Sequence, residues 1–230
     1  REINDFDLHQ LLTLGKEIDQ PADRNLLHCI PTGYKIDATR GIRDPRGMYA
    51  DMLGVDMHIV SARAGALRNV ATCVERCHLD IEAIVAAPYA SGLACLVEDE
   101  IDLGVTIVDM GGGTTTIAVF YDGEVVHIDS IPVGGKHVTS DIARGLATPL
   151  AHAERMKTLY GSTLPSPTDE RELIDVPLIG EEPSNNPNHV PRSLLNGIIR
   201  PRMEETFELV RSRLELARMD RFAGRRLVLT

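Results

Sequence analysis

Tryptophan is absent from this chain of 230 residues, which has only five tyrosines and four phenylalanines. With so few large aromatic side chains, we expect a core built mainly from isoleucine, leucine, valine and alanine. The 43% share of hydrophobic residues is ample for such a core. The length allows either one large domain or two small ones.

Further absences narrow the class of protein. No run approaches the ~18 consecutive apolar residues of a membrane span, and no signal peptide is recognisable. Four cysteines in a chain this long do not make a secreted disulfide framework. The net charge of −10 argues against a nucleic-acid surface, because binding phosphates needs a basic face. We therefore expect a cytoplasmic protein without a nucleic-acid partner.

The most informative stretch is residues 105–135, which read VTIVDMGGGTTTIAVFYDGEVVHIDSIPVGG. Its apolar and β-branched runs predict strands at 105–109, 115–121 and 124–133. Asp122-Gly123 is a two-residue hairpin signal between the second and third of these strands.

Three consecutive glycines, Gly111, Gly112 and Gly113, stand before Thr114 between the first two strands. Glycines let the backbone bend tightly and bring bare N–H groups close to an anion. The carboxylate of Asp109 is suitably placed to hold a hydrated divalent cation beside phosphates. We predict a phosphate-binding hairpin, and the plainer alternative is a glycine-rich turn without a ligand.

The sequence excludes two other phosphate-binding motifs. A Walker A loop needs Lys-Ser or Lys-Thr after its last glycine and then a helix. A dinucleotide fingerprint spaces its glycines as G-x-G-x-x-G and also opens a helix. Here the glycines are consecutive and a strand follows.

The hairpin resembles the second phosphate-binding hairpin of the actin, Hsp70 and sugar-kinase superfamily, apolar-apolar-Asp-x-Gly-Gly-Gly-Thr. The stretches LLHCIPTGYKID, IPVGGKHVTSDIARGL, AHAERMKTLYGS and RRLVLT extend the similarity over almost the whole chain. In this order they resemble the FtsA family of bacterial cell-division proteins. The resemblance implies a partial α/β, actin-like (ribonuclease H-like) ATPase fold, with a small α+β subdomain of the 1C type at the N-terminal end.

The resemblance also implies how the chain is divided. We expect a 1C-type (SHS2-like) subdomain at 1–82, a returning segment and helix of 1A at 83–102, subdomain 2A with the hairpin at 103–150, 2B at 151–222 and the start of the last 2A strand at 223–230. The family's first phosphate hairpin, its adenosine-contacting Gly-Gly turn and its membrane-attaching C-terminal helix are not among these residues. We therefore expect an interior fragment.

Hydrophobic periodicity and turn residues predict the remaining elements. We expect helices within 1–20 and at 63–78, 90–96, 142–146, 149–160 and 193–216; strands at 26–34, 53–61, 84–85, 173–179 and 227–230; and loops at 36–49 and 181–191. Pro31 and Gly33 indicate an irregular or edge strand, and Pro201 argues against one unbroken final helix.

Gly134 and Gly135 allow two interpretations. Their N–H groups and the following helix can point at phosphates, or they form an ordinary strand-to-helix turn with a Ser or Asp cap. Glu154 and Lys157, at i and i+3, most often form a solvated ion pair. The family uses a Glu-x-x-Lys here against the ribose and base of adenosine. The resemblance therefore favours a nucleotide site for all four residues, with ATP and Mg²⁺ as cofactors.

The cysteines raise a metal hypothesis. Cys73 and Cys77 lie at i and i+4 with His78 beside them, but zinc usually needs four ligands and no second pair at ligand spacing occurs. Buried or half-buried helix cysteines are the ordinary interpretation, and we expect Cys29 and Cys95 to be small core residues.

Catalytic activity is expected to be weak at most. Chaperone and sugar-kinase relatives typically carry a Glu or another polar group just before the proline that corresponds to Pro88. Ala87 stands there, and alanine cannot position a water or accept its proton.

Arg192, Arg200 and Arg202 form a local basic group on an acidic protein. The plainer interpretation is surface ion pairs at a helix start. In the family this region, 2B, receives the acidic C-terminal tail of FtsZ, and arginine forks suit carboxylates. Arg202 matches the family motif best.

The resemblance implies an ATP-binding adaptor that links the FtsZ ring to the cytoplasmic face of the membrane at the division site. Self-association into filaments would use 1C and 2B, and other division proteins would bind 1C. Membrane contact would need the C-terminal helix. The alternatives are a small-molecule kinase or chaperone-type ATPase of the same fold, and the pilus-assembly actin homologue.

Overall fold

Three sheets and seven helices are formed by residues 1–17, 21–180, 188–219, 221–222 and 225–230, the part of the computed structural model described here. This part divides into two units. The first comprises Arg1–Val108, Ile117–Ile128 and Met219–Thr230, and the second comprises Asp109–Thr116 and Asp129–Arg218.

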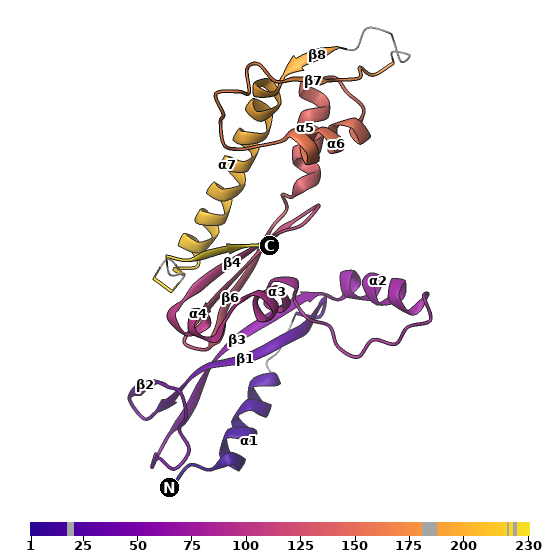
Figure 1. Ribbon diagram of the computed structural model, residues 1–230. Coiled ribbons are helices and arrows are strands. Elements are labelled where there is room, and N and C mark those ends of the chain that lie inside the picture. The colour runs from indigo at the N-terminus through magenta and orange to yellow at the C-terminus, as the bar shows by residue number, and fades with distance from the viewer. Residues whose placement is uncertain (18–20, 181–187, 220, 223–224) are drawn as a thin grey trace. The chain divides into compact units, whose positions relative to one another are not determined.

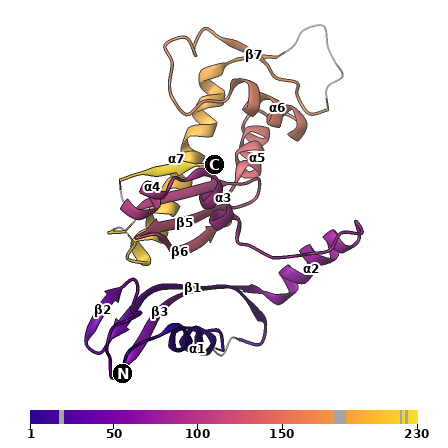
Figure 2. The same cartoon turned by 60° about the horizontal axis from the view of Figure 1, so that its bottom comes forward.

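The N-terminal part of the first unit is a three-stranded antiparallel sheet of order β2-β1-β3, with β1 at Arg24–Ile36, β2 at Thr39–Ile42 and β3 at Leu53–Arg63. Helix α1 (Asp5–Lys16) lies along one face of this sheet, and α2 (Ala64–Glu75) follows β3 (Figure 2). The register of β1 against β3 shifts between Pro31 and Gly33. The predicted irregularity is therefore confirmed, because proline has no N–H for the ladder.

Several predictions for this region are wrong. The predicted loop 36–49 contains β2, which follows a tight turn at Asp37 (φ 51°). No strand forms at 84–85, where Ile84 and Val85 are 44% and 46% exposed. An apolar pair becomes a strand only when another strand pairs with it through hydrogen bonds, and no described strand pairs with residues 84–85.

The cysteine expectations also need correction. Cys73, Cys77 and Cys95 are exposed, and only Cys29 is half-buried. Small size permits burial but does not enforce it, so a helix position facing solvent leaves the thiol exposed. Within the described residues, no three histidine, cysteine or acidic side chains come together in a way that could hold a metal ion.

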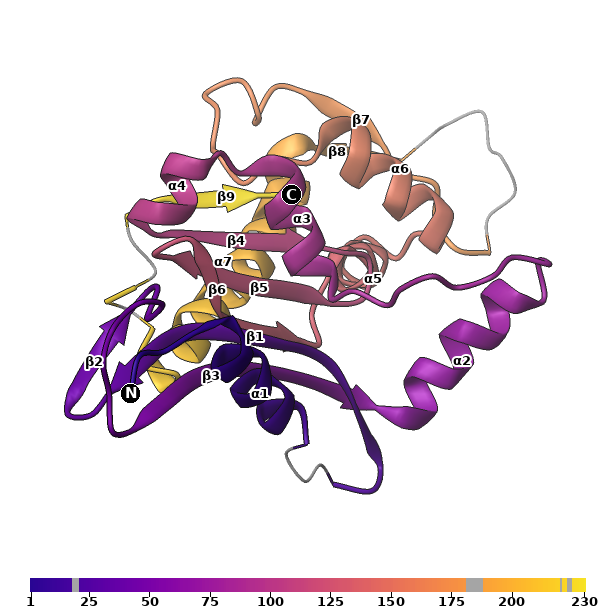
Figure 3. The same ribbon diagram turned by 90° about the horizontal axis from the view of Figure 1, so that it is seen from below.

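The second sheet has four strands in the order β6-β5-β4-β9: β4 at Val105–Met110, β5 at Thr115–Tyr121, β6 at Glu124–Ile131 and β9 at Leu227–Leu229 (Figure 3). β5 has the bounds predicted from its β-branched run, and β6 ends two residues early. The turn between β5 and β6 has positive φ at Asp122 and Gly123, which confirms the hairpin signal. β9 pairs with β4 in parallel.

Helix α3 (Ala87–Cys95) packs on the part of this sheet that belongs to the first unit, and α4 (Glu98–Leu103) follows it. Phe120 is 1% exposed within a cluster formed with Val105, Ile107 and Val125. Gly92 of α3 touches the Phe120 ring so closely that a Cβ there would lie 2.2 Å from Cζ. The helix approaches the sheet at the distance that only glycine permits.

The second unit contains α5 (Gly135–Gly145), α6 (Leu150–Tyr160), α7 (Arg192–Leu216) and the two-stranded sheet of β7 (Leu173–Asp175) and β8 (His189–Pro191). Figure 1 shows α7 running beside α5. Helix α7 continues through Pro201, so the break that this proline suggested does not occur.

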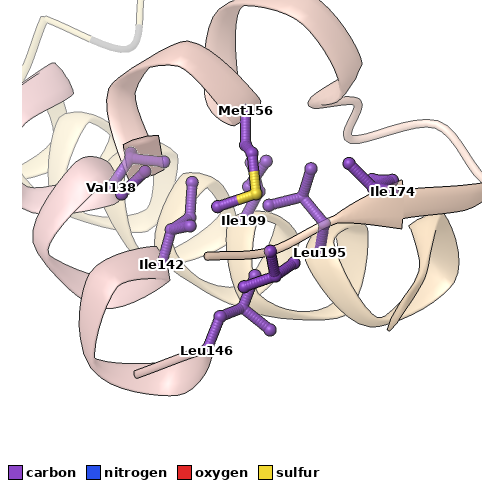
Figure 4. Close-up of a cluster of buried hydrophobic side chains, with 9 residues drawn as sticks. Val138, Ile142, Leu146, Met156, Ile174, Leu195 and Ile199 are labelled. Atoms are coloured by element: carbon purple, nitrogen blue, oxygen red, sulfur yellow. The ribbon is translucent and has the colours of Figure 1, made fainter. Parts of the chain in front are cut away.

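The core of the second unit is drawn in Figure 4, where Val138 and Ile142 of α5 and Leu146 directly after it meet Met156 of α6, Ile174 of β7 and Leu195 and Ile199 of α7. Each of these side chains is at most 6% exposed. Full burial of one such side chain contributes about 1.5–3 kcal/mol. Hydrophobic packing therefore holds the three helices together more than their surface ion pairs do.

The remaining predictions for the second unit are mixed. α6 matches its predicted range closely, whereas β7 is shorter than the predicted strand 173–179. β8 occupies the end of the predicted loop 181–191, of which residues 181–187 lie outside the described residues. None of the described helices combines the length and apolar character that crossing a membrane requires.

Two glycines in helices make a matched pair for a stability test. Gly92→Ala should destabilise the protein by about 1–3 kcal/mol, because the new Cβ overlaps Phe120. Gly197→Ala in α7 meets nothing within 4 Å and should be neutral or stabilising by up to about 1 kcal/mol. Urea unfolding of both variants measures this, and equal effects would contradict the packing described for α3.

Candidate functional site

Residues 111–114, called the glycine hairpin from here on, connect β4 to β5. Gly112, Gly113 and Thr114 are exposed, and a Cβ on Gly113 would meet nothing within 4 Å. The first residue of β5 anchors the hairpin, since the buried Thr115 hydroxyl donates to the Val133 carbonyl at 2.8 Å. The tip is therefore open to a ligand while its base is held.

The start of α5 packs directly on the glycine hairpin. The N–H of Gly135 donates to the Gly111 carbonyl at 3.0 Å, and the N–H of Lys136 donates to the Gly112 carbonyl at 2.8 Å. The Gly134 N–H donates to Nδ1 of His137 at 3.1 Å. The N–H groups of Gly134 and Gly135 are thus used within the protein, and that they point at phosphates stays a prediction.

Gly134 instead provides space. A Cβ at this position would lie 2.4 Å from the Gly111 carbonyl oxygen, 2.8 Å from the Thr114 nitrogen and 2.9 Å from the Gly112 carbonyl carbon. Its φ of −159° is extended backbone that any residue adopts. Glycine is needed at position 134 because the backbone here packs directly on the backbone of the glycine hairpin.

Helix α5 begins at Gly135, seven residues before the predicted start at 142. The predicted Ser or Asp cap is wrong, because Asp141 lies inside the helix, as do the hydroxyl-bearing Thr139 and Ser140. Their hydroxyls donate to the carbonyls of Gly135 and Lys136, one turn back, at 3.0 and 2.9 Å. Such hydroxyls can cap a helix or bond backwards within it, so their presence alone does not locate the start.

Glu154 and Lys157 form the ion pair expected from their spacing, with Nζ to Oε2 at 2.8 Å. Lys157 Nζ also donates to the Gly135 carbonyl at 3.3 Å, which places the pair against the start of α5. Hydrogen bonds from Lys157 and Thr139 lower the pKa of the Glu154 carboxyl. Residues from three distant parts of the sequence therefore lie in one chain of contacts, from the glycine hairpin through α5 to α6.

Asp109 lies near the end of β4, half-buried, just before the glycine hairpin. One carboxylate does not make a complete cation site, but Mg²⁺ typically keeps several waters and is bound by one or two carboxylates plus phosphates. Asp109 beside an open, glycine-lined tip fits that kind of site. The residues present are therefore compatible with a hydrated Mg²⁺ that accompanies a phosphate ligand.

Lys136 is a residue that the sequence prediction missed. A Cβ on Gly112 would lie 3.9 Å from Lys136 Cε, so this side chain runs beside the glycine hairpin. The first turn of α5 contains no acidic residue, although acidic residues stabilise that end of a helix. A lysine in the first helical turn after a double glycine is the signal that could have identified it.

The structure does not bring the three arginines of α7 together. Arg192 donates to Glu172 at 2.7 Å and to the Tyr160 carbonyl at 2.7 Å, and Glu172 raises the pKa of its guanidinium. Arg200 pairs with Glu204 one turn along α7.

Arg202 bonds both carboxylate oxygens of Asp141 on α5, at 2.6 and 3.3 Å, and also pairs with Glu205. Two residues that are two positions apart on an α-helix are separated by a rotation of about 200° around the helix axis. Arg200 and Arg202 therefore lie on nearly opposite sides of α7. The three arginines form separate ion pairs and no common basic surface.

Comparison with known proteins covers both units. A family model described as Cell division protein FtsA matches residues 106–225, and one described as SHS2 domain inserted in FTSA matches residues 1–61. The chain is 50% identical over 230 residues to the cell division protein FtsA of Rhizobium meliloti, covering 100% of this chain and 52% of that protein.

The cell division protein FtsA of Escherichia coli K12 is 35% identical over 209 residues, covering 91% of this chain and 49% of that protein. The chain thus spans about half the length of the curated relatives it matches. Among solved structures it is similar to MreB5 of Spiroplasma citri bound to ADP (TM-score 0.52, 25% identity, covering 66% of this chain and 47% of that one). It is also similar to a PilM–PilN type IV pilus biogenesis complex (TM-score 0.59, 16% identity, 100% and 64%). These neighbours support the expected actin-like fold.

A second pair of glycines tests the geometry of the site. Gly134→Ala should push α5 away from the glycine hairpin and destabilise the protein by about 1–3 kcal/mol, because its Cβ overlaps backbone atoms that cannot rotate away. Gly113→Ala, at the open tip, should leave stability nearly unchanged. Thermal unfolding and amide NMR shifts of residues 111–114 check both. Unshifted amides in Gly134→Ala would refute the close approach.

Proposed function

Because this chain belongs to the FtsA family of cell-division proteins, we propose that it is the nucleotide-binding and partner-binding part of an actin-like division adaptor. The observation that supports this most directly is the contact chain of the second unit. It joins the glycine hairpin, the start of α5 and the Glu154–Lys157 pair into one polar, partly exposed surface.

The proposed ligand of this surface is ATP. The exposed backbone of the glycine hairpin receives the phosphates, and the ammonium group of Lys136 offsets part of their charge. Glu154 and Lys157 contact the nucleoside. Gly134 and Gly135 contribute by letting α5 approach the hairpin. The solved neighbour MreB5, whose fold is similar, was determined bound to ADP and to AMPPNP.

Asp109 is proposed to bind a hydrated Mg²⁺ through water. Bound there, the ion would neutralise phosphate charge. The carboxylate would orient one or two of its waters, a contact that depends on the ionised form of Asp109.

The proposed cellular role is that of the family: an adaptor that captures the C-terminal tail of FtsZ and links the FtsZ ring to the cytoplasmic face of the membrane at the division site. We further propose that tail capture uses subdomain 2B, with Arg192, Arg200 and Arg202 as candidate contacts. Self-association would use 1C and 2B, and other division proteins would bind 1C. The subdomain boundaries expected from the resemblance belong to this proposal.

Turnover of ATP is proposed to be slow. Ala87 opens α3 with a methyl side chain, and a methyl group can neither orient nor deprotonate an attacking water. Nucleotide would then act by favouring one assembly state over another, which requires different affinity for the two states.

Asp109→Asn tests the cation site. It should weaken ATP binding in the presence of Mg²⁺ by roughly tenfold or more, since residues that orient a metal's ligands typically change affinity by about 10–100-fold. With EDTA present, the variant and the parent chain should bind ATP alike. Titration calorimetry with and without Mg²⁺ measures this, and an unchanged Mg²⁺ dependence would remove Asp109 from the site.

Arg202→Glu tests tail capture. It should weaken binding of an FtsZ tail peptide by about tenfold or more, because a charge-assisted hydrogen bond contributes about 1.5–3 kcal/mol. Fluorescence anisotropy with the labelled peptide measures the affinity.

Asp141→Asn is the matched control, since it weakens the link between α5 and α7 but keeps the arginine. If both variants lose the peptide equally, the arginine acts through the fold. If only Arg202→Glu does, the arginine contacts the tail. Full retention by Arg202→Glu would exclude it from the interface.

A further inference from the structure

The buried hydroxyl of Thr139 contacts three polar groups. It lies on α5 with only 6% of its surface exposed. Its Oγ1 is 3.0 Å from the Gly135 carbonyl, 2.5 Å from Glu154 Oε2 and 3.0 Å from Lys157 Nζ. Three polar groups from two helices therefore converge on a single oxygen.

The chemistry of these groups assigns the direction of the bonds. An ammonium group can only donate, so Lys157 Nζ donates to a lone pair of Oγ1. Carbonyl and carboxylate oxygens accept, so the one hydroxyl proton is shared between the Gly135 carbonyl and Glu154 Oε2. The hydroxyl is thus donor and acceptor at once, which no apolar side chain of the same shape can reproduce.

Without Thr139, the longer bond from Lys157 Nζ to the Gly135 carbonyl, at 3.3 Å, would remain to tie the Glu154–Lys157 pair to α5. The side chains of Glu154 and Lys157 are 53% and 24% exposed, and they are three residues apart on one helix. An exposed pair of this kind is weak and leaves both side chains free to rotate. Thr139 adds a buried anchor on a second helix, so the pair acquires a defined position relative to α5.

The same contacts leave part of Glu154 available. Oε2 accepts from both Thr139 and Lys157, at 2.5 and 2.8 Å. Among the described residues, no hydrogen bond to Oε1 is formed. A carboxylate fixed through one oxygen presents the other in a constant direction, which suits recognition of a sugar hydroxyl.

We propose that Thr139 is a positioning residue for the nucleoside end of the nucleotide site, holding Glu154 and Lys157 in the orientation that the sugar and base require. This inference rests on the proposed ATP-binding function and deepens it. Through the Gly135 carbonyl, the same hydroxyl also connects this end to the turn that packs on the glycine hairpin.

The test compares Thr139→Val, which keeps the shape and loses the hydroxyl, with Thr139→Ser, which keeps the hydroxyl. Thr139→Val should weaken binding of ATP and of adenosine by about three- to tenfold, and Thr139→Ser by less than about twofold. Inorganic tripolyphosphate, which lacks the nucleoside, should bind the parent and both variants alike. Calorimetry or ligand-observed NMR at millimolar ligand measures each affinity.

A pH titration separates positioning from a general loss of structure. Hydrogen bonds from Lys157 and Thr139 lower the pKa of Glu154 in the parent chain, so its carboxylate stays ionised to lower pH. Thr139→Val removes one of these bonds, so the pKa of Glu154 should rise toward its ordinary value. Adenosine affinity should then be lost at a higher pH than in the parent as the solution is acidified. Carboxyl NMR shifts of Glu154 follow the same change without a ligand.

The outcomes distinguish the two proposals. If the parent binds ATP and Thr139→Val binds it equally, with an unchanged Glu154 titration, Thr139 has no positioning role and the nucleotide proposal stands. If tripolyphosphate binding falls as much as adenosine binding, the threonine acts on the fold and the inference is overturned. If the parent binds neither ATP nor adenosine at millimolar concentration, both proposals are overturned.

Discussion

The contact between Gly134 and the glycine hairpin is the constraint on which the candidate site depends. Two backbone segments meet at a distance that excludes even a methyl group. Because these segments touch, the first two N–H groups of α5 donate hydrogen bonds to the carbonyls of Gly111 and Gly112. The helix start, its dipole and the side chains of its first turns are thereby fixed beside the open tip of the hairpin. This packing contact therefore positions the polar groups of the α5 start relative to the hairpin.

In the second unit, one face of α5 and α6 contributes to the hydrophobic core and another face contributes to the polar site. Val138 and Ile142 of α5 point into the cluster with α6 and α7, while Thr139, between them in sequence, reaches toward Glu154. Met156 anchors α6 in the core next to Lys157. Burial of the apolar residues thus sets the separation of α5 and α6, and the hydroxyl and the ion pair fill the space that remains.

Sequence patterns predicted the structure correctly where a residue type has one strong conformational preference. The β-branched run of β5, the Asp122-Gly123 turn and the spacing of Glu154 and Lys157 all predict what the structure contains. They failed where a group has two possible partners. The hydroxyl of Ser140 could cap a helix or bond within it, and the contact of the α5 start with the glycine hairpin decides, because it begins the helix earlier. Arginines close in sequence suggested a cluster, but helix geometry separates Arg200 from Arg202.

Pro201 has a mechanical consequence for α7. A proline carries no amide hydrogen, so the carbonyl of Gly197 one turn earlier cannot receive the usual bond along the rod. Helix α7 nevertheless remains continuous through its 25 residues. Because this turn has one hydrogen bond fewer, α7 bends there more easily than at a turn with its full set of bonds.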